Sequence, residues 1–365
     1  MPTWVDKPLP EMVERLWFST DVLRPYRGEW RAVRRDSRLE LNMTFRMSDE
    51  RFSRLRQTIL ANVAADWVVP FWHERTRRLS LTNGQTVIPV NTDADYRVGG
   101  LAMIWSSCDD YETATIDSVG VGSITLSAGL GVDYVGAAVM PAHNAFINGS
   151  IQVGRQNRNL IEFSLIFQLR DAGSLGATVW TTYQGYEVLN CENGYLSRLE
   201  GIIRPNIEYM DSDLGPVVLE EARAEVDQLY AVELSKHAWD VKQFLHKIRG
   251  RDMPFWVKAW GGRLHVDAAG SGSNTIQIDE SLAVADWVGR HIVVDGIYRE
   301  VTAAVDLTGA KQNLTLDSVL GADVAAGAPC HLLMLVRCDS DDIEISHVHG
   351  FSNSVSFPVM EDQAA

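Results

Sequence analysis

Residues 68–72 read VVPFW and residues 252–256 read DMPFW, so the chain uses Pro-Phe-Trp twice, 184 residues apart. The neighbours of the two motifs also recur in the same order, at offsets between 184 and 194 residues. The matched pairs are Gly28 with Gly215, Ser48 with Ser235, Arg78-Leu79 with Arg263-Leu264, Val98-Gly99 with Val288-Gly289, Ile124-Thr125-Leu126 with Leu314-Thr315-Leu316, Leu130-Gly131 with Leu320-Gly321, and Phe163 with Phe357. Collinear matches with a drifting offset are typical of a duplicated domain with small loop insertions. The sequence therefore predicts two tandem copies of one domain.

Length and composition fit this prediction. A chain of 365 residues is expected to form two domains, and its 46% hydrophobic and 22% charged residues are ordinary for folded proteins. No apolar run approaches the length of a membrane span, and the N-terminal residues lack the pattern of a secretory signal. We expect no membrane insertion and synthesis in the cytoplasm.

Each copy is predicted to contain one helix. In the first copy, alternation over LELNMTF indicates a strand, Ser48 is a good N-cap, and the apolar residues that follow have helical spacing to about residue 62. In the second copy, Ser235 stands at the same place, and Gly250 is a suitable end for a helix over about 235–249.

After each PFW the period changes to short β-rich segments. The segments RLSL, TVIPV, GLAMIW, TATIDSV, SITL and AAVMP in the first copy correspond in order to RLHV, NTIQI, HIVVDG, YREVTAAV, NLTL and CHLLMLV in the second. Turn residues separate them at spacings of about 8–12 residues, which favours a sandwich or barrel. The predicted fold is mainly β (β+α), with two tandem β-barrel or sandwich domains that each carry one flanking helix.

The PFW motifs are predicted to mark the core where the chain enters each barrel, with the aromatic rings buried against the helix. These repeat-core markers are Pro70, Phe71, Trp72, Pro254, Phe255 and Trp256. The predicted boundaries are 1–175 for the first domain, 176–212 for an ordered bridge with some β character, and 213–365 for the second copy.

The net charge of −15 is unevenly distributed. Residues 1–80 carry 15 Lys and Arg and 11 Asp and Glu, a net +4, so the rest of the chain carries −19. A protein that grips nucleic acid shows the reverse balance. An acidic surface would let DNA slide past without sticking, or would serve solubility alone.

A search for catalytic and metal-binding motifs finds little. His73-Glu74 opens HERTR, but a zinc protease needs a second His where Arg77 stands. His347 and His349 are two apart on an expected strand and could bind a metal, but surface decoration is the more common role of such a pair. The four cysteines form no CxxC motif, so reduced, partly buried thiols are expected. We predict no enzyme, no cofactor and no metal site.

Four segments resemble the tail-tip, or baseplate, proteins of long-tailed bacteriophages that are made after the tape-measure protein. They are FSTDVLRPYRGEWRAVRRDSRLELNMTFRM (18–47), VVPFWHERTRRLSL (68–81), TTYQGYEVLNCENGY (181–195) and LGPVVLEEARAEV (214–226). In such proteins a strand pair, a helix and a β-barrel recur in each half, and the resemblance spans nearly the whole chain.

The resemblance implies a distal tail protein: a structural virion protein that forms a ring at the end of the tail. Such a ring joins the tail tube to the hub and fibres and lines the channel through which DNA passes without specific binding. Its partners would be copies of itself and the tube, hub, tape-measure and fibre proteins, with assembly in the host cytoplasm. Three chains of two domains would give a pseudo-sixfold ring, which we favour over a hexamer.

Alternative functions stay open at this point. They are a major tail-tube subunit with two tube domains per chain, a host-surface or carbohydrate-binding module, and a cell-wall hydrolase. For the ring, the expected subunit contacts are the strand-pair segments 31–47 and 217–234 and the β edges. The basic residues Arg31, Arg34, Arg35 and Arg38 are candidate contacts to an acidic face of the next chain, or form a solvated charged strand.

Overall fold

The computed structural model confirms a mainly β protein, with 56% of residues in strands and 11% in helices. It describes residues 1–18, 20–23, 29–32, 37–157, 159–170, 180–189, 196–205, 209–210, 217–218, 224–234, 238–259, 264–279, 282–348 and 352–361. Elements up to residue 170 are β1 (Met12–Trp17), β2 (Thr20–Leu23), β3 (Glu29–Ala32), β4 (Arg38–Ser48), α1 (Asp49–Ala61), β5 (Trp67–Pro70), the 3-10 turn η1 (Trp72–Glu74), β6 (Thr76–Leu81), β7 (Val87–Pro89), β8 (Leu101–Ser107), β9 (Asp110–Gly120), β10 (Ser123–Leu126), β11 (Tyr134–Asn157) and β12 (Leu160–Leu169).

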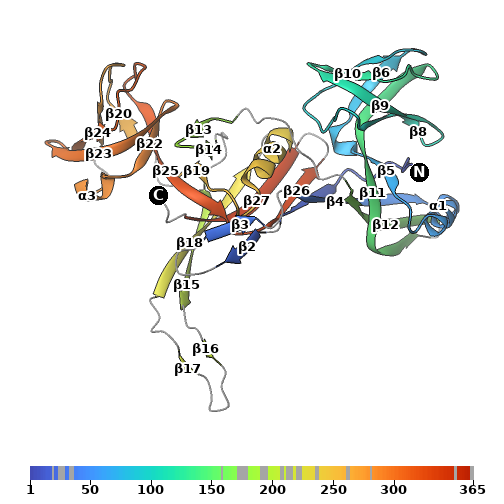
Figure 1. Ribbon diagram of the computed structural model, residues 1–365, viewed down its shortest axis with the longest axis horizontal. Helices are drawn as coiled ribbons and strands as arrows, with labels where there is room; N and C mark the ends of the chain where they lie inside the picture. The colour runs from blue at the N-terminus through green and yellow to red at the C-terminus, as the bar shows by residue number, and fades with distance from the viewer. Residues whose placement is uncertain are drawn as a thin grey trace. The chain divides into compact units, whose positions relative to one another are not determined.

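After two short strands, the remaining elements repeat most of this series, with the added helix α3 and with β25 and β26 in place of β11 (Figure 1). They are β13 (Thr182–Tyr183), β14 (Tyr186–Val188), β15 (Leu196–Pro205), β16 (Tyr209–Met210), β17 (Val217–Val218), β18 (Ala224–Leu234), α2 (Ala238–Ile248), β19 (Phe255–Lys258), β20 (Leu264–Val266), β21 (Thr275–Asp279), α3 (Val284–Trp287), β22 (His291–Val294), β23 (Ile297–Leu307), β24 (Lys311–Leu316), β25 (Ala328–Cys338), β26 (Asp342–Val348) and β27 (Ser352–Glu361).

The chain divides into two compact units, and neither is continuous in sequence. Unit 1 contains Met1–Thr178, Leu234–Asp252 and Asp341–Ser356, and unit 2 contains the remaining segments. The helix α2 and the strand β26 therefore belong to unit 1, although the sequence prediction assigns both to the second copy. The repeat in sequence and the compact unit in space have different boundaries.

The first barrel lies in unit 1. Its strands pair in the order β6–β11–β8–β9–β10–β7, and every pair is antiparallel. Inward-facing residues such as Ile88, Ile104, Ile116 and Ile124 are buried in its core. In Figure 1 the long strand β11 runs from this barrel to β12, with which it forms a second antiparallel ladder.

The second barrel lies in unit 2 and is closed. Its six strands pair in the cycle β20–β21–β24–β23–β22–β25 and back to β20. Strand for strand, this is the order of the first barrel. The core again contains alternate strand residues, among them Ile278, Ile292 and Leu314, together with Trp287 from α3.

Equivalent backbone hydrogen bonds confirm the repeat at the level of atoms. The amide of Gly99 donates to Ile116 at 2.8 Å, and the amide of the matched Gly289 donates to Val301 at 2.8 Å. Both glycines have positive φ, 78° and 82°, a conformation that glycine adopts without steric cost. The matched residues Leu130 and Leu320 likewise donate to Gln85 and Ser273.

The elements around the barrels repeat as well. In the first copy, β1 pairs with β4, the short hairpin β2–β3 stands between them in sequence, and β4 pairs with β12. In the second copy, β15 pairs with β18, the hairpin β16–β17 stands between them, and β18 pairs with β27. Because β15 takes the place of β1, the structural repeat extends upstream of residue 213 into the segment predicted as a bridge.

Both predicted helices are present. Ser48 is the N-cap of α1, since its side chain accepts a hydrogen bond from the amide of Arg51 at 3.3 Å. The helix α2 is followed by Arg249 and Gly250, which both have positive φ and end the helix. The predicted cap Ser235 lies outside the described residues.

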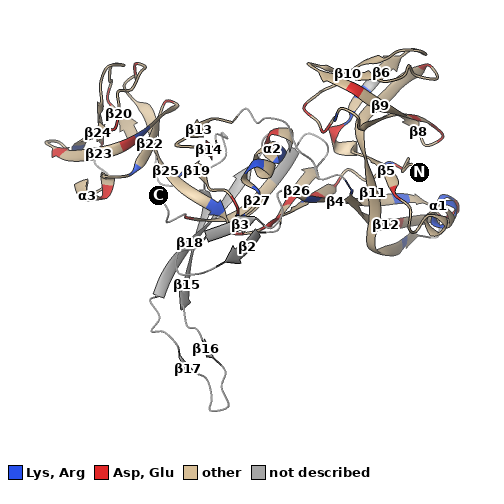
Figure 2. Cartoon of the chain, viewed as in Figure 1, with Lys and Arg blue, Asp and Glu red and all other residues tan. Residues whose placement is uncertain are grey.

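Charged side chains are spread over many elements rather than gathered on one (Figure 2). The negative charge is therefore not confined to one described strand or helix. The charged residues with the most unusual surroundings are those inside unit 1.

Candidate functional site: a buried ionic cluster

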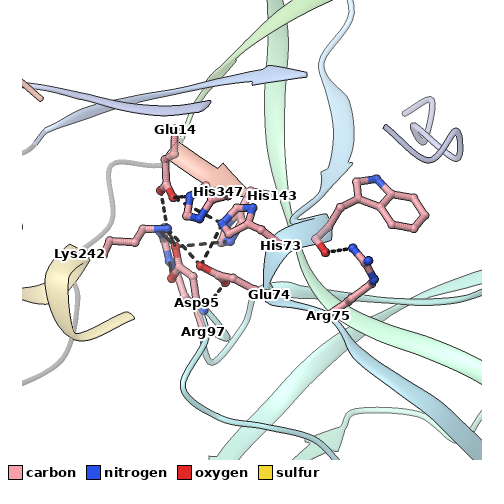
Figure 3. A network of polar contacts seen from close by, with 10 residues as sticks. Glu14, His73, Glu74, Arg75, Asp95, Arg97, His143, Lys242 and His347 are labelled. Carbon is pink, nitrogen blue, oxygen red and sulfur yellow. Dashed lines mark hydrogen bonds and ion pairs between the residues drawn. The ribbon is translucent and has the colours of Figure 1, made fainter. Parts of the chain in front are cut away.

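Eight ionisable residues from six separate segments meet inside unit 1 (Figure 3). We call them the ionic cluster: Glu14 on β1, His73 and Glu74 on η1, Asp95 and Arg97 in the loop between β7 and β8, His143 on β11, Lys242 on α2, and His347 on β26. Two of the segments come from the second copy in sequence. Long-range folding, rather than any local motif, creates this site.

Lys242 is the central cation of the cluster. Its Nζ lies 2.6 Å from Glu14 Oε1, 3.4 Å from Glu74 Oε1 and 3.7 Å from Asp95 Oδ2, and its side chain is only 1% exposed. Burial alone would lower the pKa of Lys242, but the three carboxylates outweigh burial and raise it. The lysine is therefore charged and holds three carboxylates that would otherwise repel one another.

A second group surrounds Glu14. His347 Nε2 lies 3.1 Å from Glu14 Oε2, His73 Nε2 lies 3.4 Å from the same oxygen, and the two imidazole rings stack with centroids 3.9 Å apart. Burial lowers the pKa of His73, but Glu14 and Glu74 outweigh it and raise the pKa to about 8. His73 is therefore an imidazolium at pH 7.

A third group surrounds Asp95. Arg97 donates two hydrogen bonds to its carboxylate at 2.7 and 2.6 Å, and the Asp95 amide donates to Glu74 Oε2 at 2.7 Å. Burial raises the pKa of Asp95, but Lys242 and Arg97 outweigh it and hold the pKa below its usual range. Burial lowers the pKa of the neighbouring His143 to about 4, so this ring is neutral.

Each carboxylate of the cluster lies beside at least one cation. Three carboxylates, Glu14, Glu74 and Asp95, face three cations, Lys242, Arg97 and the imidazolium of His73. Buried ions are tolerated when they are paired and hydrogen-bonded, whereas one unpaired buried charge costs several kcal/mol. Each charged member of the cluster therefore depends on its neighbours for its charged state.

The distances between ligand atoms would allow a metal ion in the cluster, but the orientation of the two imidazole rings would not. The ligand atoms of Glu14, His73 and His347 all lie within 4.8 Å of one another. A metal must lie close to the plane of each imidazole that binds it, and two rings tilted by only 20° have planes that meet far from both rings. Lys242 already supplies a cation 2.6 Å from Glu14. The arrangement fits an ammonium and an imidazolium better than a metal.

Catalysis fits the cluster no better. The side chains of Glu14, Lys242 and His347 are 1% exposed, and that of His73 is 2% exposed. A general acid or base must come within hydrogen-bonding distance of its substrate. These groups are sealed, so their arrangement favours a structural role in joining distant segments.

The repeat-core markers occupy buried positions. Pro70, Phe71, Trp72, Pro254, Phe255 and Trp256 are all buried. Trp72 packs edge-on against Trp105, and Trp256 Nε1 donates to the carbonyl of Tyr183 at 3.0 Å. The helix residue that lies over the Phe71 ring is Lys242 of α2, not a residue of α1 as the expected packing within one copy would require.

The predicted arginine contacts to a neighbouring chain stay a prediction, because Arg38 is the one of the four whose side chain the structure describes. Arg38 lies on β4, is exposed, and stands opposite Trp17 of β1. Only the backbone of Arg31 is described, on β3, where it stands opposite Asp21. Arg34 and Arg35 lie outside the described residues.

Three members of the cluster, His73, Glu74 and His347, stand out in the sequence under a different interpretation, and the other five do not. His73-Glu74 was considered only as part of an incomplete zinc-protease motif, and His347 only as half of a pair with His349, which lies outside the described residues. One signal was available: Lys242 lies among the buried apolar residues Val241, Phe244 and Leu245 of α2. A lysine on an apolar helix face requires a buried partner.

Comparison with models of known protein families gives no match, and no curated protein matches the sequence. In the part of the chain that the structure describes, no helix has the length and apolar character needed to cross a bilayer. The proposal for function therefore depends on the repeat, the fold and the sequence resemblance.

Proposed function

We propose that the protein is a structural subunit of a bacteriophage tail tip, a distal tail protein that assembles into a ring between the tail tube and the hub. The observation that carries this proposal is the complete repeat of strand pair, helix and six-stranded barrel within one chain. The tail-tip proteins that the sequence resembles have this plan in each half. A duplicated subunit provides two similar surfaces per chain, which suits a ring with pseudo-sixfold symmetry.

The surroundings of the unusual residues support a structural role. The only group of candidate metal ligands in the described chain belongs to the ionic cluster, in which Glu14 is buried and paired with Lys242. Five tryptophans are fully buried, namely Trp4, Trp67, Trp72, Trp256 and Trp287. They are therefore not free to stack on sugars, which weakens the carbohydrate-binding alternative.

The test is the mass of the purified protein in solution by light scattering, followed by negative-stain imaging. Rings of three chains with a pseudo-sixfold outline are the expected result. Long polymers would favour the tail-tube alternative. A chain that stays monomeric at high concentration would contradict the proposed ring, and glycan binding or peptidoglycan clearing in a zymogram would then favour the alternatives.

A further inference from the structure

The strand β26 forms a ladder that joins the two copies of the sequence. It pairs antiparallel with β1, from Met12↔His347 to Trp17↔Asp342, and on its other side it pairs with β27. In this ladder an edge strand of the second copy meets the first strand of the first copy. The facing edges of β1 and β26 therefore have hydrogen-bonding partners within unit 1.

The repeat identifies the strand of the first copy that corresponds to β26. Phe163 of β12 matches Phe357 of β27, and Val153 of β11 stands opposite Phe163. Extending the β26–β27 register by two residues beyond its last pair, Ile345↔Val355, puts Ile343 opposite Phe357. The outer part of β11, residues 152–157, is therefore the equivalent of β26.

The repeat likewise identifies the equivalent of β1. The offset of 187 residues between Ser48 and Ser235 carries Met43 of β4 to Tyr230 of β18. Their ladder partners are Met12 of β1 and Leu199 of β15, which are also 187 residues apart. Two independent ladders thus place β15 in the position of β1.

These two equivalents each have one free edge in the described structure. From residue 146 onward, β11 pairs with β12 alone, whereas β26 has a partner on both sides. Among the described strands, β15 pairs with β18 alone, whereas β1 pairs with both β4 and β26. An open strand edge exposes a row of backbone donors and acceptors that can pair with another chain.

The exposed fractions of the side chains differ in the same way between the paired strand β26 and the open edge of β11. Ile343 is 1% exposed where β26 lies between two strands, but its equivalent Val153 is 49% exposed on the open edge of β11. Residues 152–157 are all exposed. In the first copy the outer edge of β11 therefore has no partner among the described strands, whereas in the second copy β1 covers the corresponding edge of β26.

We propose that β15 of one chain pairs antiparallel with the outer part of β11 in a neighbouring copy of this chain. The pairing repeats between chains the ladder that β1 and β26 form within one chain. It rests on the proposed ring and identifies the strands that close it. Transferring the known register gives six pairs, from Leu199↔Asn157 to Arg204↔Gln152, with Ile203 opposite Val153.

The two edges differ, so the contact is head-to-tail. Head-to-tail contacts produce closed rings when the rotation between neighbours closes, and open filaments when it does not. Main-chain hydrogen bonds give the affinity of strand addition, and the facing side chains give its specificity. In the proposed ladder Val153 stands opposite Ile203, so a lysine at position 153 would replace an apolar pair.

The test compares wild type with Val153→Lys and with a matched control, Val121→Lys. Val121 lies in the β9–β10 turn, is fully exposed, and is not part of either edge. Both variants should fold with the circular dichroism spectrum of the wild type, because both side chains are exposed. By light scattering, Val121→Lys should form rings like the wild type, and Val153→Lys should remain a monomer.

A second measurement tests the register. Val153→Cys combined with Ile203→Cys should give a ladder of disulfide-linked chains on mild oxidation, while the off-register pair Val153→Cys with Ile202→Cys should give much less. Wild type treated in the same way controls for the native cysteines. Wild-type rings with unchanged assembly of Val153→Lys and no ladder would overturn the strand pairing but leave the proposed ring intact. A wild-type chain that stays monomeric would contradict both.

Discussion

The helices α1 and α2 occupy the same place in the two copies, yet their surroundings differ. In α1 only Ile59 is buried, and Leu60 is 62% exposed. In α2 the buried residues are Val241, Lys242, Phe244, Leu245 and Ile248. Of two helices at matched positions, only α2 is enclosed by segments of the other copy.

Lys242 marks this difference in its most extreme form. By the offset of 187 residues it corresponds to Leu55, which is half-buried on the sheet-facing side of α1. An apolar residue is sufficient where a helix packs on one sheet. A charged residue at the matched position requires three carboxylates from other segments, and unit 1 provides them.

The largest expected effect comes from Lys242→Met, which keeps the length of the side chain and removes the central charge. Three buried carboxylates then lose their main cation, so unit 1 should lose about 3–5 kcal/mol of stability. Hydrogen exchange of β1 and β26 amides reports on unit 1 specifically. On α1, Arg54→Met removes only an exposed pair with Glu50 and should cost less than about 0.5 kcal/mol. Equal losses in the two helices would remove the distinction between them.

The next effect is a pH dependence of unit 1. The pKa of His73 is about 8 in the folded state and about 6.5 when unfolded, so its contribution is complete below pH 6.5 and disappears as pH rises through 8. A shift of this size corresponds to roughly 2 kcal/mol. His143 acts in the opposite direction, because its folded pKa of about 4 removes stability as pH falls from 6.5 toward 4.

We therefore expect exchange protection of β1 and β26 to be greatest near pH 6.5 and to fall on both sides, after correction for intrinsic exchange rates. The fall in protection below pH 6.5 should be larger still, because the pKa values of Glu14 and Glu74 are also lowered and these carboxylates lose their charge as the pH falls. In His73→Gln the fall in protection above pH 6.5 should disappear, and the fall below pH 6.5 should remain. If the fall above pH 6.5 persists in this variant, another titrating group causes it.

The smallest effect concerns the start of α1. Ser48→Ala removes the acceptor for the Arg51 amide and should cost about 1 kcal/mol. Ser53 is an exposed residue in the middle of the same helix, so Ser53→Ala should be neutral or slightly stabilising. Urea unfolding followed by circular dichroism compares the two. A loss in Ser53→Ala as large as in Ser48→Ala would show that the cap is not the cause.

Sequence patterns predicted the fold in considerable detail. The twelve barrel segments, both helices and their order follow from local period and from repeated neighbours such as Val98-Gly99 and Val288-Gly289. These signals depend on residues that are close in sequence, so each strand or helix carries its own signal. The same argument applies to Ser48, whose capping role depends on a residue three positions away.

The ionic cluster could not be predicted in this way. Glu14 and His347 are 333 residues apart, and the Lys242 contact to Glu74 spans 168 residues. No periodicity connects such residues, and the repeat itself was misleading because it assigns α2 and β26 to the second copy. His73-Glu74 gave a visible signal, but a motif search interprets it by its neighbours in sequence rather than by its neighbours in space.

The discontinuity of unit 1 has a consequence for synthesis on the ribosome. The first barrel has all its strands once residue 157 has emerged, but β1 and Glu14 receive their last partners only with β26, near residue 347. At about 5–20 residues per second, the nascent chain spends roughly ten to forty seconds with that edge and that carboxylate uncovered. Newly made chains on neighbouring ribosomes therefore present an edge for mispairing before their own strand arrives, and slower translation lengthens that interval.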